Sequence, residues 1–91
     1  MPVYTFTTLD DPLGTNGTEA RGINDAGQVV GAYQDAAGKL HGFLYRAGGF
    51  TTIDVPGASS TTVTGVGDRG QIVGWYVNAA GEHGFEVSPA A

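Results

Sequence analysis

Short runs of hydrophobic and β-branched residues alternate along this chain with clusters of Gly, Asp, Asn and Pro. Val, Thr, Tyr and Phe favour strands, and the residues of the clusters favour tight turns. Sixteen glycines divide the chain into many short pieces, and no segment favours a helix. The pattern predicts an all-β chain of short antiparallel strands.

Eight strands are expected from this pattern. The first lies in residues 3–12, where Pro12 ends it, and the other seven form a full unit in residues 20–56 and a three-stranded unit in residues 63–87. Their expected bounds are 20–24, 28–34, 39–46, 50–55, 63–67, 71–77 and 82–87. Gly27 stands third in the turn after the first of these seven, which predicts a type I turn closed by a left-handed residue.

The sequence of the full unit recurs in the three-stranded unit. Residues 22–33 match residues 65–76, 43 positions later, with coinciding Gly, Asp, Gln, Val and Tyr. Residues 6–12 likewise match residues 50–56. Four-stranded repeats of about 40–45 residues are typical of β-propeller blades. The expected architecture is therefore two four-stranded antiparallel blades, permuted by one strand.

Two blades cannot close a propeller, which has about 4–8 of them. Open sheet edges and faces favour association, so we expect the chain to complete a β-propeller as a homo-oligomer. Residues 3–12 of one chain would supply a fourth strand to residues 63–87 of its neighbour. Two, three or four chains satisfy the blade count, and we favour a trimer as the middle solution. Deleting residues 1–12 is expected to abolish assembly.

The chain has 91 residues, enough for one small domain, and a net charge of -5. This charge disfavours nucleic acid and anionic membrane surfaces as partners, because both attract clustered cations. The absence of cysteine excludes disulfides and cysteine-based metal or redox sites. No apolar run approaches the roughly 20 residues of a membrane span, and residues 1–6 lack the features of a secretory signal.

His41 and His83 occupy the same place in the two units, each before Gly and Phe. A repeated histidine pair can bind metal or transfer protons, but these two should lie a blade apart. Hydrogen bonding inside each blade is the favoured interpretation. Asp25, Asp35 and Asp68 are assigned to turn formation, because the alternating acidic ligands of a calcium loop are absent around them. We expect no metal and no cofactor.

An enzyme is not expected either. Asp10, Asp54 and Glu86 could supply carboxylates, but a twofold repeat offers no unlike environments for an acid and a base. Residues 65–70 spell Gly-x-Gly-x-x-Gly, yet they lie between short strands and open no helix, so they do not predict a dinucleotide site. The nucleophile elbow Gly-x-Ser-x-Gly is absent from the sequence.

Tyr33, Trp75 and Tyr76 are the candidate ligand-binding residues. They end equivalent strands beside polar turns, and aromatic rings with polar neighbours can stack on sugar rings. The tyrosines recur in both units, which fits packing between blades at least as well. Trp75 replaces Ala32 and is the one aromatic residue that the repeat does not require.

The chain resembles the HAF repeat family, predicted extracellular repeats of bacterial proteins. Three motifs carry the resemblance: Gly-Ile-Asn-Asp-x-Gly-Gln-Val-Val-Gly in residues 22–31, His-Gly-Phe-Leu-Tyr in residues 41–45, and Phe-Thr-Thr-Ile-Asp-Val-Pro-Gly-Ala in residues 50–58. The second copy departs from them, with Gly67 for Asn24 and Glu86-Val87 for Leu44-Tyr45. The resemblance extends from Phe6 to Phe85. It implies a repeat architecture and an extracellular setting, but no reaction and no catalytic residues.

Two functions agree with these observations. The first is a non-catalytic, self-assembling β-propeller module with a structural or interaction-mediating role. The second is multivalent, lectin-like binding of carbohydrate, with weak sites repeated around a ring. The near identity of the repeats also agrees with a two-repeat excerpt of a longer array, natural or engineered. The residues themselves assign no compartment.

Overall fold

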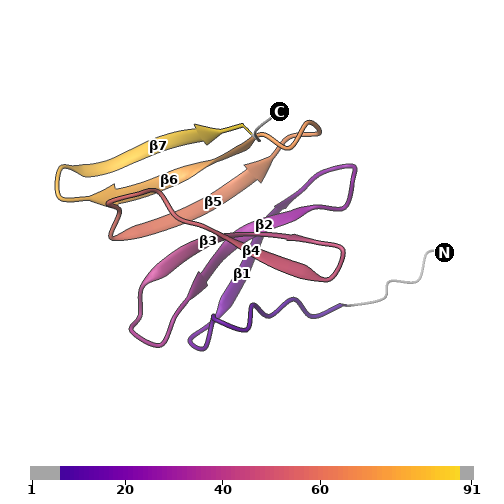
Figure 1. Ribbon diagram of the computed structural model, residues 1–91, viewed down its shortest axis with the longest axis horizontal. Helices are drawn as coiled ribbons and strands as arrows, with labels where there is room; N and C mark the ends of the chain where they lie inside the picture. The colour runs from indigo at the N-terminus through magenta and orange to yellow at the C-terminus, as the bar shows by residue number, and fades with distance from the viewer. Residues whose placement is uncertain (1–6, 89–91) are drawn as a thin grey trace.

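The computed structural model describes residues 7–88 of the chain. Within these residues it contains seven strands and no helix, arranged in two antiparallel sheets (Figure 1). Sheet A has four strands in sequential order: β1 (Thr18–Ile23), β2 (Val29–Gln34), β3 (Leu40–Arg46) and β4 (Gly49–Ile53). Sheet B has three: β5 (Ser60–Val66), β6 (Ile72–Asn78) and β7 (Gly81–Val87). The predicted all-β class is confirmed, and the described part of one chain closes no ring.

The strand expected in residues 3–12 is not formed in the part that the structure describes. Residues 7–17 run as turns and irregular backbone into β1, and residues 3–6 lie outside the described residues. A strand needs a partner for its backbone hydrogen bonds, and the partner expected here belongs to another chain. That intermolecular pairing stays a prediction. Among the other strands, the largest shift is at β5, which begins at Ser60 instead of Val63.

The two sheets have the same pairing register. Tyr33 pairs with His41 in sheet A, and Tyr76 pairs with His83 in sheet B. A bulge interrupts β1 just after Ala20, and β5 has its bulge at the corresponding place. Residues of sheet A can therefore be matched one by one with residues of sheet B.

Gly31 and Gly74 lie beside these bulges, at matching places in β2 and β6. A Cβ atom added at Gly31 would overlap the carbonyl oxygen of Glu19, and one added at Gly74 would overlap the carbonyl oxygen of Thr62. The obstacle is backbone of the neighbouring strand, which no rotamer change can move. Glycine at the centre of each second strand is therefore a steric requirement of the bulged pairing.

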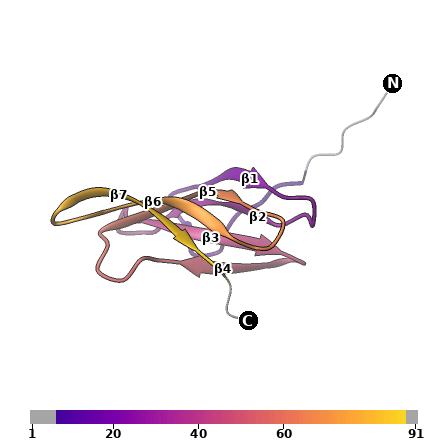
Figure 2. The same ribbon diagram turned by 90° about the horizontal axis from the view of Figure 1, so that it is seen from above.

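The two sheets pack through unlike faces: sheet B lies above sheet A in the view of Figure 1 and overlaps it when seen from above (Figure 2). Side chains alternate between the faces of a strand, and paired residues share a face. We name the two faces in contact after one residue of each. The Val30 face of sheet A consists of Val30, Ala32, Leu44 and Ile53. The Ile72 face of sheet B consists of Val63, Val66, Ile72 and Phe85.

The faces that remain are the counterparts of these two. The Phe43 face of sheet A matches the Ile72 face, and it consists of Ile23, Val29, Tyr33, Phe43, Tyr45 and Phe50. The Val73 face of sheet B matches the Val30 face, and it consists of Val73, Trp75, Val77 and Glu86. Each sheet thus uses one kind of face in the internal contact and keeps the other kind outside.

β5 is the strand of sheet B that lies across sheet A, in contact with β1, β2 and β3. Two glycines permit this close approach. A Cβ at Gly22 would be 3.0 Å from the carbonyl oxygen of Thr64, and one at Gly42 would be 2.7 Å from Cγ2 of Val63. The backbone at these two glycines therefore fixes how near, and in which direction, sheet B crosses sheet A.

Candidate functional site

Tyr33, the first predicted ligand-binding residue, is part of the interior of sheet A. Its side chain lies among packed groups and the residue is 3% exposed. The phenol oxygen is 3.0 Å from Oγ1 of Thr52, and the ring stacks on His41 with 4.9 Å between ring centroids. Little of this ring is open to a sugar, so the geometry favours packing.

Trp75 and Tyr76 are half-buried, unlike Tyr33. They lie on opposite faces of sheet B. Tyr76 lies beside His83, with 5.1 Å between ring centroids, and points to the same side as the Ile72 face. Trp75 is on the Val73 face, opposite Gly84. The three predicted residues are therefore not brought together into one binding site.

His41 joins two acidic side chains of sheet A. Its Nε2 atom lies 2.7 Å from Oδ2 of Asp35, and its Nδ1 atom lies 2.8 Å from Oδ2 of Asp54. Both partners are carboxylates that accept hydrogen bonds, so both ring nitrogens must donate and the ring is an imidazolium. The hydrogen bonding predicted for His41 inside its own sheet is confirmed.

Electrostatics in this cluster shift two titrations. Burial acts to lower the pKa of His41, but the hydrogen bonds with Asp35 and Asp54 outweigh it and hold the pKa above its usual 6.5. The hydrogen bond with His41, followed by that from the backbone N–H of Lys39, lowers the pKa of Asp35 below 3.8. The ion pair of His41 with Asp35 is therefore charged on both sides between these two values.

We expect the stability contributed by His41 to be lost as pH rises. A histidine whose pKa is raised by folding stabilises the fold fully below pH 6.5, and this contribution disappears as pH passes through the raised value. At the acid end, the contribution of Asp35 is lost as pH falls through its lowered pKa. His41→Gln should cost about 2 kcal/mol at pH 6 and progressively less at higher pH. Urea unfolding at a series of pH values measures this difference.

His83→Gln is the matched control for that experiment, with unfolding of both variants followed on dissociated single chains. His83 has the same place in sheet B, but within residues 7–88 its ring is hydrogen-bonded only to Asn78, with 3.2 Å between Nε2 and Oδ1. Asn78 is neutral, so this substitution breaks no ion pair within a single chain. An equal, pH-independent loss in both variants would contradict the role given to the two carboxylates.

Of the three aspartates assigned to turn formation, only Asp35 bonds to the backbone of its own turn within the described residues; Asp68 instead accepts from the N–H of Asp25 in the other sheet. Asp35 accepts hydrogen bonds from the backbone N–H groups of Ala37 and Lys39, as expected of a turn aspartate. In the first turn, however, this role belongs to Asn24 and not to Asp25. Asn24 is the first residue of that turn, because its carbonyl oxygen accepts from the N–H of Gly27. The expected left-handed residue is confirmed by the φ of 80° at Gly27.

Asn24 also links the two sheets. Its Nδ2 atom donates to the carbonyl oxygen of Gly67, its own counterpart in sheet B, at 3.0 Å. The backbone N–H of Asp25 donates to Oδ1 of Asp68 at 3.3 Å. Glycine at position 67 has no side chain to repeat the first of these bonds towards a further sheet.

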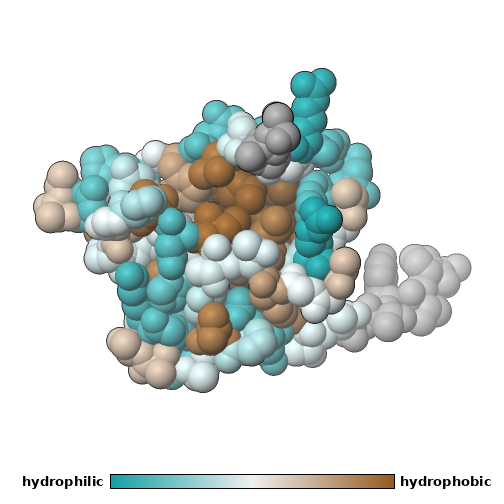
Figure 3. All heavy atoms as spheres, viewed as in Figure 1, coloured by the Kyte–Doolittle hydropathy of each residue, from teal (hydrophilic) through white to brown (hydrophobic). Residues whose placement is uncertain are grey.

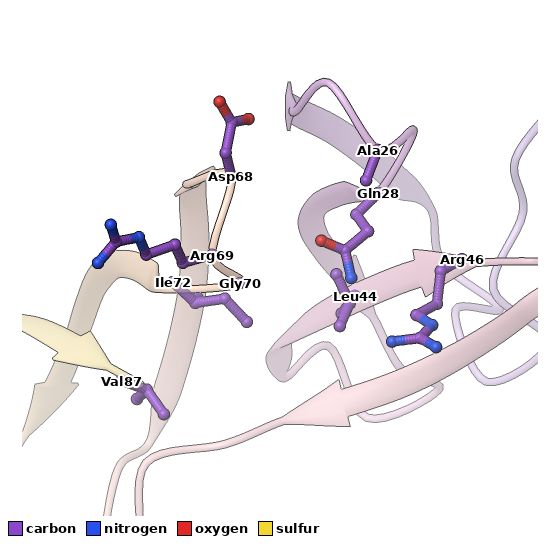
Figure 4. A pocket seen from close by; sticks show the side chains of 9 residues that line it. All are labelled: Ala26, Gln28, Leu44, Arg46, Asp68, Arg69, Gly70, Ile72 and Val87. Atoms are coloured by element: carbon purple, nitrogen blue, oxygen red, sulfur yellow. The ribbon is translucent and has the colours of Figure 1, made fainter. Parts of the chain in front are cut away.

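A cleft of about 570 Å³ opens between the two sheets at the end near these turns (Figure 4). It is lined by Ala26, Gln28, Leu44 and Arg46 from sheet A, and by Asp68, Arg69, Gly70, Ile72 and Val87 from sheet B. Hydrophobic residues gather at the junction of the sheets, bordered by hydrophilic ones (Figure 3). Both arginines are exposed, and none of the polar side chains buried within residues 7–88 lines the cleft. We assign the cleft to inter-sheet packing.

No metal site is formed by the described residues: within 7–88, no group of three or more His, Asp or Glu side chains is arranged to hold an ion. The cluster of His41 fails this requirement because Asp35 and Asp54 lie against opposite edges of the ring. In the same part of the chain, no helix is long and apolar enough to cross a membrane.

Two exposed apolar side chains were not singled out by sequence. Ile23 on the Phe43 face is 69% exposed, and Val73 on the Val73 face is 44% exposed. Their counterparts in the other sheet are Val66 and Val30, which both belong to the core packed between the sheets. The sequence does show an apolar residue at each of these matching positions of the two repeats. Only the structure shows which of the two residues is covered.

Comparison of the chain with protein-family models, with curated proteins and with solved structures finds no match. The resemblance to HAF repeats therefore stays a prediction.

Proposed function

We propose that this protein is a non-catalytic, self-assembling β-propeller module with a structural or interaction-mediating role. Copies of the chain would associate through the Phe43 face of one and the Val73 face of the next. The contact would repeat, between chains, the packing that joins sheet A to sheet B inside each chain. A face that meets an unlike face gives a head-to-tail contact, which closes into a ring when the rotation per step allows it.

The exposure of Ile23 and Val73 carries this proposal. In the internal contact, Val66 packs against the core cluster that contains Val30, and Val30 is 0% exposed. Applying the same contact between copies places Ile23 of one chain against Val73 of another. Burial of an aliphatic side chain of this size contributes about 1.5–3 kcal/mol, so covering both favours association. In an isolated chain these two side chains stay in contact with water and contribute no free energy of burial.

The aromatic side chains of sheet A supply the larger part of the expected contact. Phe43 packs edge-on against Phe50 at 5.5 Å between centroids, and Tyr45 lies 4.8 Å from Phe50. Phe43 is fully buried, whereas Tyr45 and Phe50 are half-buried. Half-buried aromatic rings at the surface are typical of the centre of protein interfaces. Three chains, giving six blades, remain our favoured ring.

Carbohydrate binding is the alternative, and it has less support. It depends on Trp75, whose matching residue in sheet A is Ala32 on the covered Val30 face. In the proposed ring the Val73 face is covered by the next copy, and Trp75 would pack at that junction. Lectin activity through Trp75 and closure of the ring by this face therefore compete for one residue.

We expect Val73→Asp to convert the assembly into folded single chains. An aspartate would place a charge in the contact between copies but leave the core between sheets A and B intact. Native mass spectrometry should give a multiple of the 9.3 kDa chain for the original protein and one chain for the variant. Circular dichroism should show the same β structure in both.

Val30→Asp is the matched control, because it makes the same change at the same place of the other sheet. Val30 is fully buried, so this variant should unfold the chain. A single-chain mass for the original protein at micromolar concentration would refute the proposed function. Binding of glycans by an assembled protein, abolished by Trp75→Ala, would favour the carbohydrate alternative.

A further inference from the structure

β4, the edge strand of sheet A, also supplies hydrogen-bond partners to side chains of the other strands. Its Thr52 hydroxyl meets the phenol oxygen of Tyr33 at 3.0 Å, and Asp54, which follows the strand, holds Nδ1 of His41 at 2.8 Å. The strand thereby completes a small polar cluster built around the stacked Tyr33 and His41 rings. Tyr33 and His41 of sheet A each have one hydrogen bond with β4 or with the residue that follows it.

Sheet B contains the same tyrosine and histidine without such a strand. Tyr76 and His83 lie with 5.1 Å between their ring centroids, as a pair that matches Tyr33 and His41. Within residues 7–88, no strand pairs with the outer edge of β7, and no hydroxyl or carboxylate takes the place of Thr52 and Asp54. The cluster of sheet B is therefore incomplete in the described part of one chain.

The residues that would complete it occur before β1. Residues 7–10, Thr-Thr-Leu-Asp, repeat Thr-Thr-Ile-Asp of residues 51–54. Thr8 corresponds to Thr52, and Asp10 corresponds to Asp54. Thr7, Thr8 and Asp10 are exposed and Leu9 is half-buried, so these side chains remain accessible to a partner.

The backbone after this segment has the same course as the connection from β4 to β5. The N–H of Asp11 donates to Oγ1 of Thr18 at 3.2 Å, and the N–H of Val55 donates to Oγ1 of Thr61 at 3.2 Å. The N–H of Asn16 bonds to β2 as the N–H of Ser59 bonds to β6. Since residues 54–59 carry the chain from one sheet to the next, residues 10–17 have the geometry of a chain arriving from a preceding sheet.

Sheet B of the same chain cannot serve as that preceding sheet. Figure 1 shows the segment before β1 and the strand β7 on opposite sides of the molecule, with the rest of sheet A and sheet B between them. A second copy, seated with its Val73 face on the Phe43 face, would instead bring its β7 to this segment. The inference below rests on the proposed head-to-tail assembly and specifies its contacts.

We propose that residues 7–10 of each copy pair with β7 of another copy and complete its tyrosine–histidine cluster. The register follows from β3 and β4, in which Gly42, Phe43 and Leu44 pair with Ile53, Thr52 and Thr51. It sets Leu9 opposite Gly84, Thr8 opposite Phe85, and Thr7 opposite Glu86. The Thr8 hydroxyl then meets the phenol oxygen of Tyr76, and the Asp10 carboxylate meets Nδ1 of His83.

A disulfide test fixes both the partner and the register. The chain has no cysteine, so the double variant Thr7→Cys, Glu86→Cys contains only the designed pair. Directly opposed residues lie within the roughly 7 Å between Cα atoms that a disulfide requires. Mild oxidation should give covalent multimers on a non-reducing gel, which disappear on reduction. In a closed ring, the mass of the largest covalent species gives the number of chains in the ring.

Thr7→Cys, Glu82→Cys is the matched control. Glu82 is an exposed glutamate of the same strand and face, four residues away, which is about 13 Å along a strand. This pair should give no multimers. Assembly with equal cross-linking in both variants, or with cross-linking only to position 82, would overturn the register while leaving the proposed function standing. A single-chain mass and no cross-linking would overturn both.

The proposed contact between Asp10 and His83 can be tested separately, by measuring the dissociation constant between copies. Asp10→Asn and His83→Gln should each weaken the junction between copies by about tenfold in dissociation constant, since each removes a hydrogen bond to a charged group. Because both remove the same contact, the double variant should be no weaker than either single one. Independent, multiplying losses would contradict the contact between Asp10 and His83.

Discussion

Gly31→Ala is expected to cost at least about 3 kcal/mol of the free energy of unfolding, at or beyond the upper end of ordinary overpacking. The new methyl group would overlap the carbonyl oxygen of Glu19 at the bulge of β1. Relief requires β1 and β2 to separate, which breaks the pairing of these two strands in the middle of their length. A small domain has a free energy of unfolding of about 5–15 kcal/mol, so this loss is a large fraction of its stability. Urea unfolding followed by circular dichroism measures the loss.

Gly49→Ala is the control for that variant. Gly49 is also in a strand of sheet A, but a Cβ there would have its nearest neighbour 3.8 Å away, at the carbonyl oxygen of Arg46. This substitution should change stability by less than about 1 kcal/mol, because glycine in a strand is itself unfavourable by a similar amount. Similar, small effects at Gly31 and Gly49 would show that the bulge can relax around a side chain.

Removing residues 1–10 should leave a folded single chain and no assembly. The deletion takes away the segment expected to pair with β7, but it keeps the hydrogen bond between Asp11 and Thr18 that shapes the entry into β1. Without the segment, the edge of β7 has unpaired backbone groups at the junction, together with the unfilled cluster of Tyr76 and His83. Sedimentation at micromolar concentration should show a fall from a multimer to one chain.

Deleting residues 1–4 alone is the control, because the match with β4 begins only at Phe6. This shorter deletion should retain the multimer. A synthetic peptide of residues 1–12, added to the protein that lacks residues 1–10, should bind in a ratio of one to one. An unchanged multimer after the longer deletion would mean that the copies associate without exchanging this segment.

The sequence was sufficient for seven of the eight expected strands, all except the one expected in residues 3–12, which is not formed in residues 7–12. Turn residues such as Gly27 mark the strand ends, and the structure gives the left-handed conformation expected there. The repeat also placed His41 and His83 at matching places of separate sheets, as the registers show. These are local properties, because the backbone conformation of a turn and the pairing of adjacent strands depend on nearby residues.

Contacts between the sheets could not be predicted in the same way. Val29 and Val30 are adjacent in β2, as Ile72 and Val73 are in β6, so both faces of each sheet are apolar at the centre. Alternation assigns residues to faces but does not say which face is covered. The role of Asn24 was missed for a related reason, since its bond to Gly67 depends on how the two turns approach each other.

The close crossing of β5 over sheet A at Gly22 and Gly42 has a consequence beyond one chain. A head-to-tail series built from one repeated step has a curvature set by the rotation of that step, and the series either returns to its start or continues as a filament. In the proposed assembly half of the steps would be fixed covalently, inside each chain, by two residues that have no side chain. A larger residue at Gly42 would tilt every such step, so a change far from any junction could open a ring into a fibre.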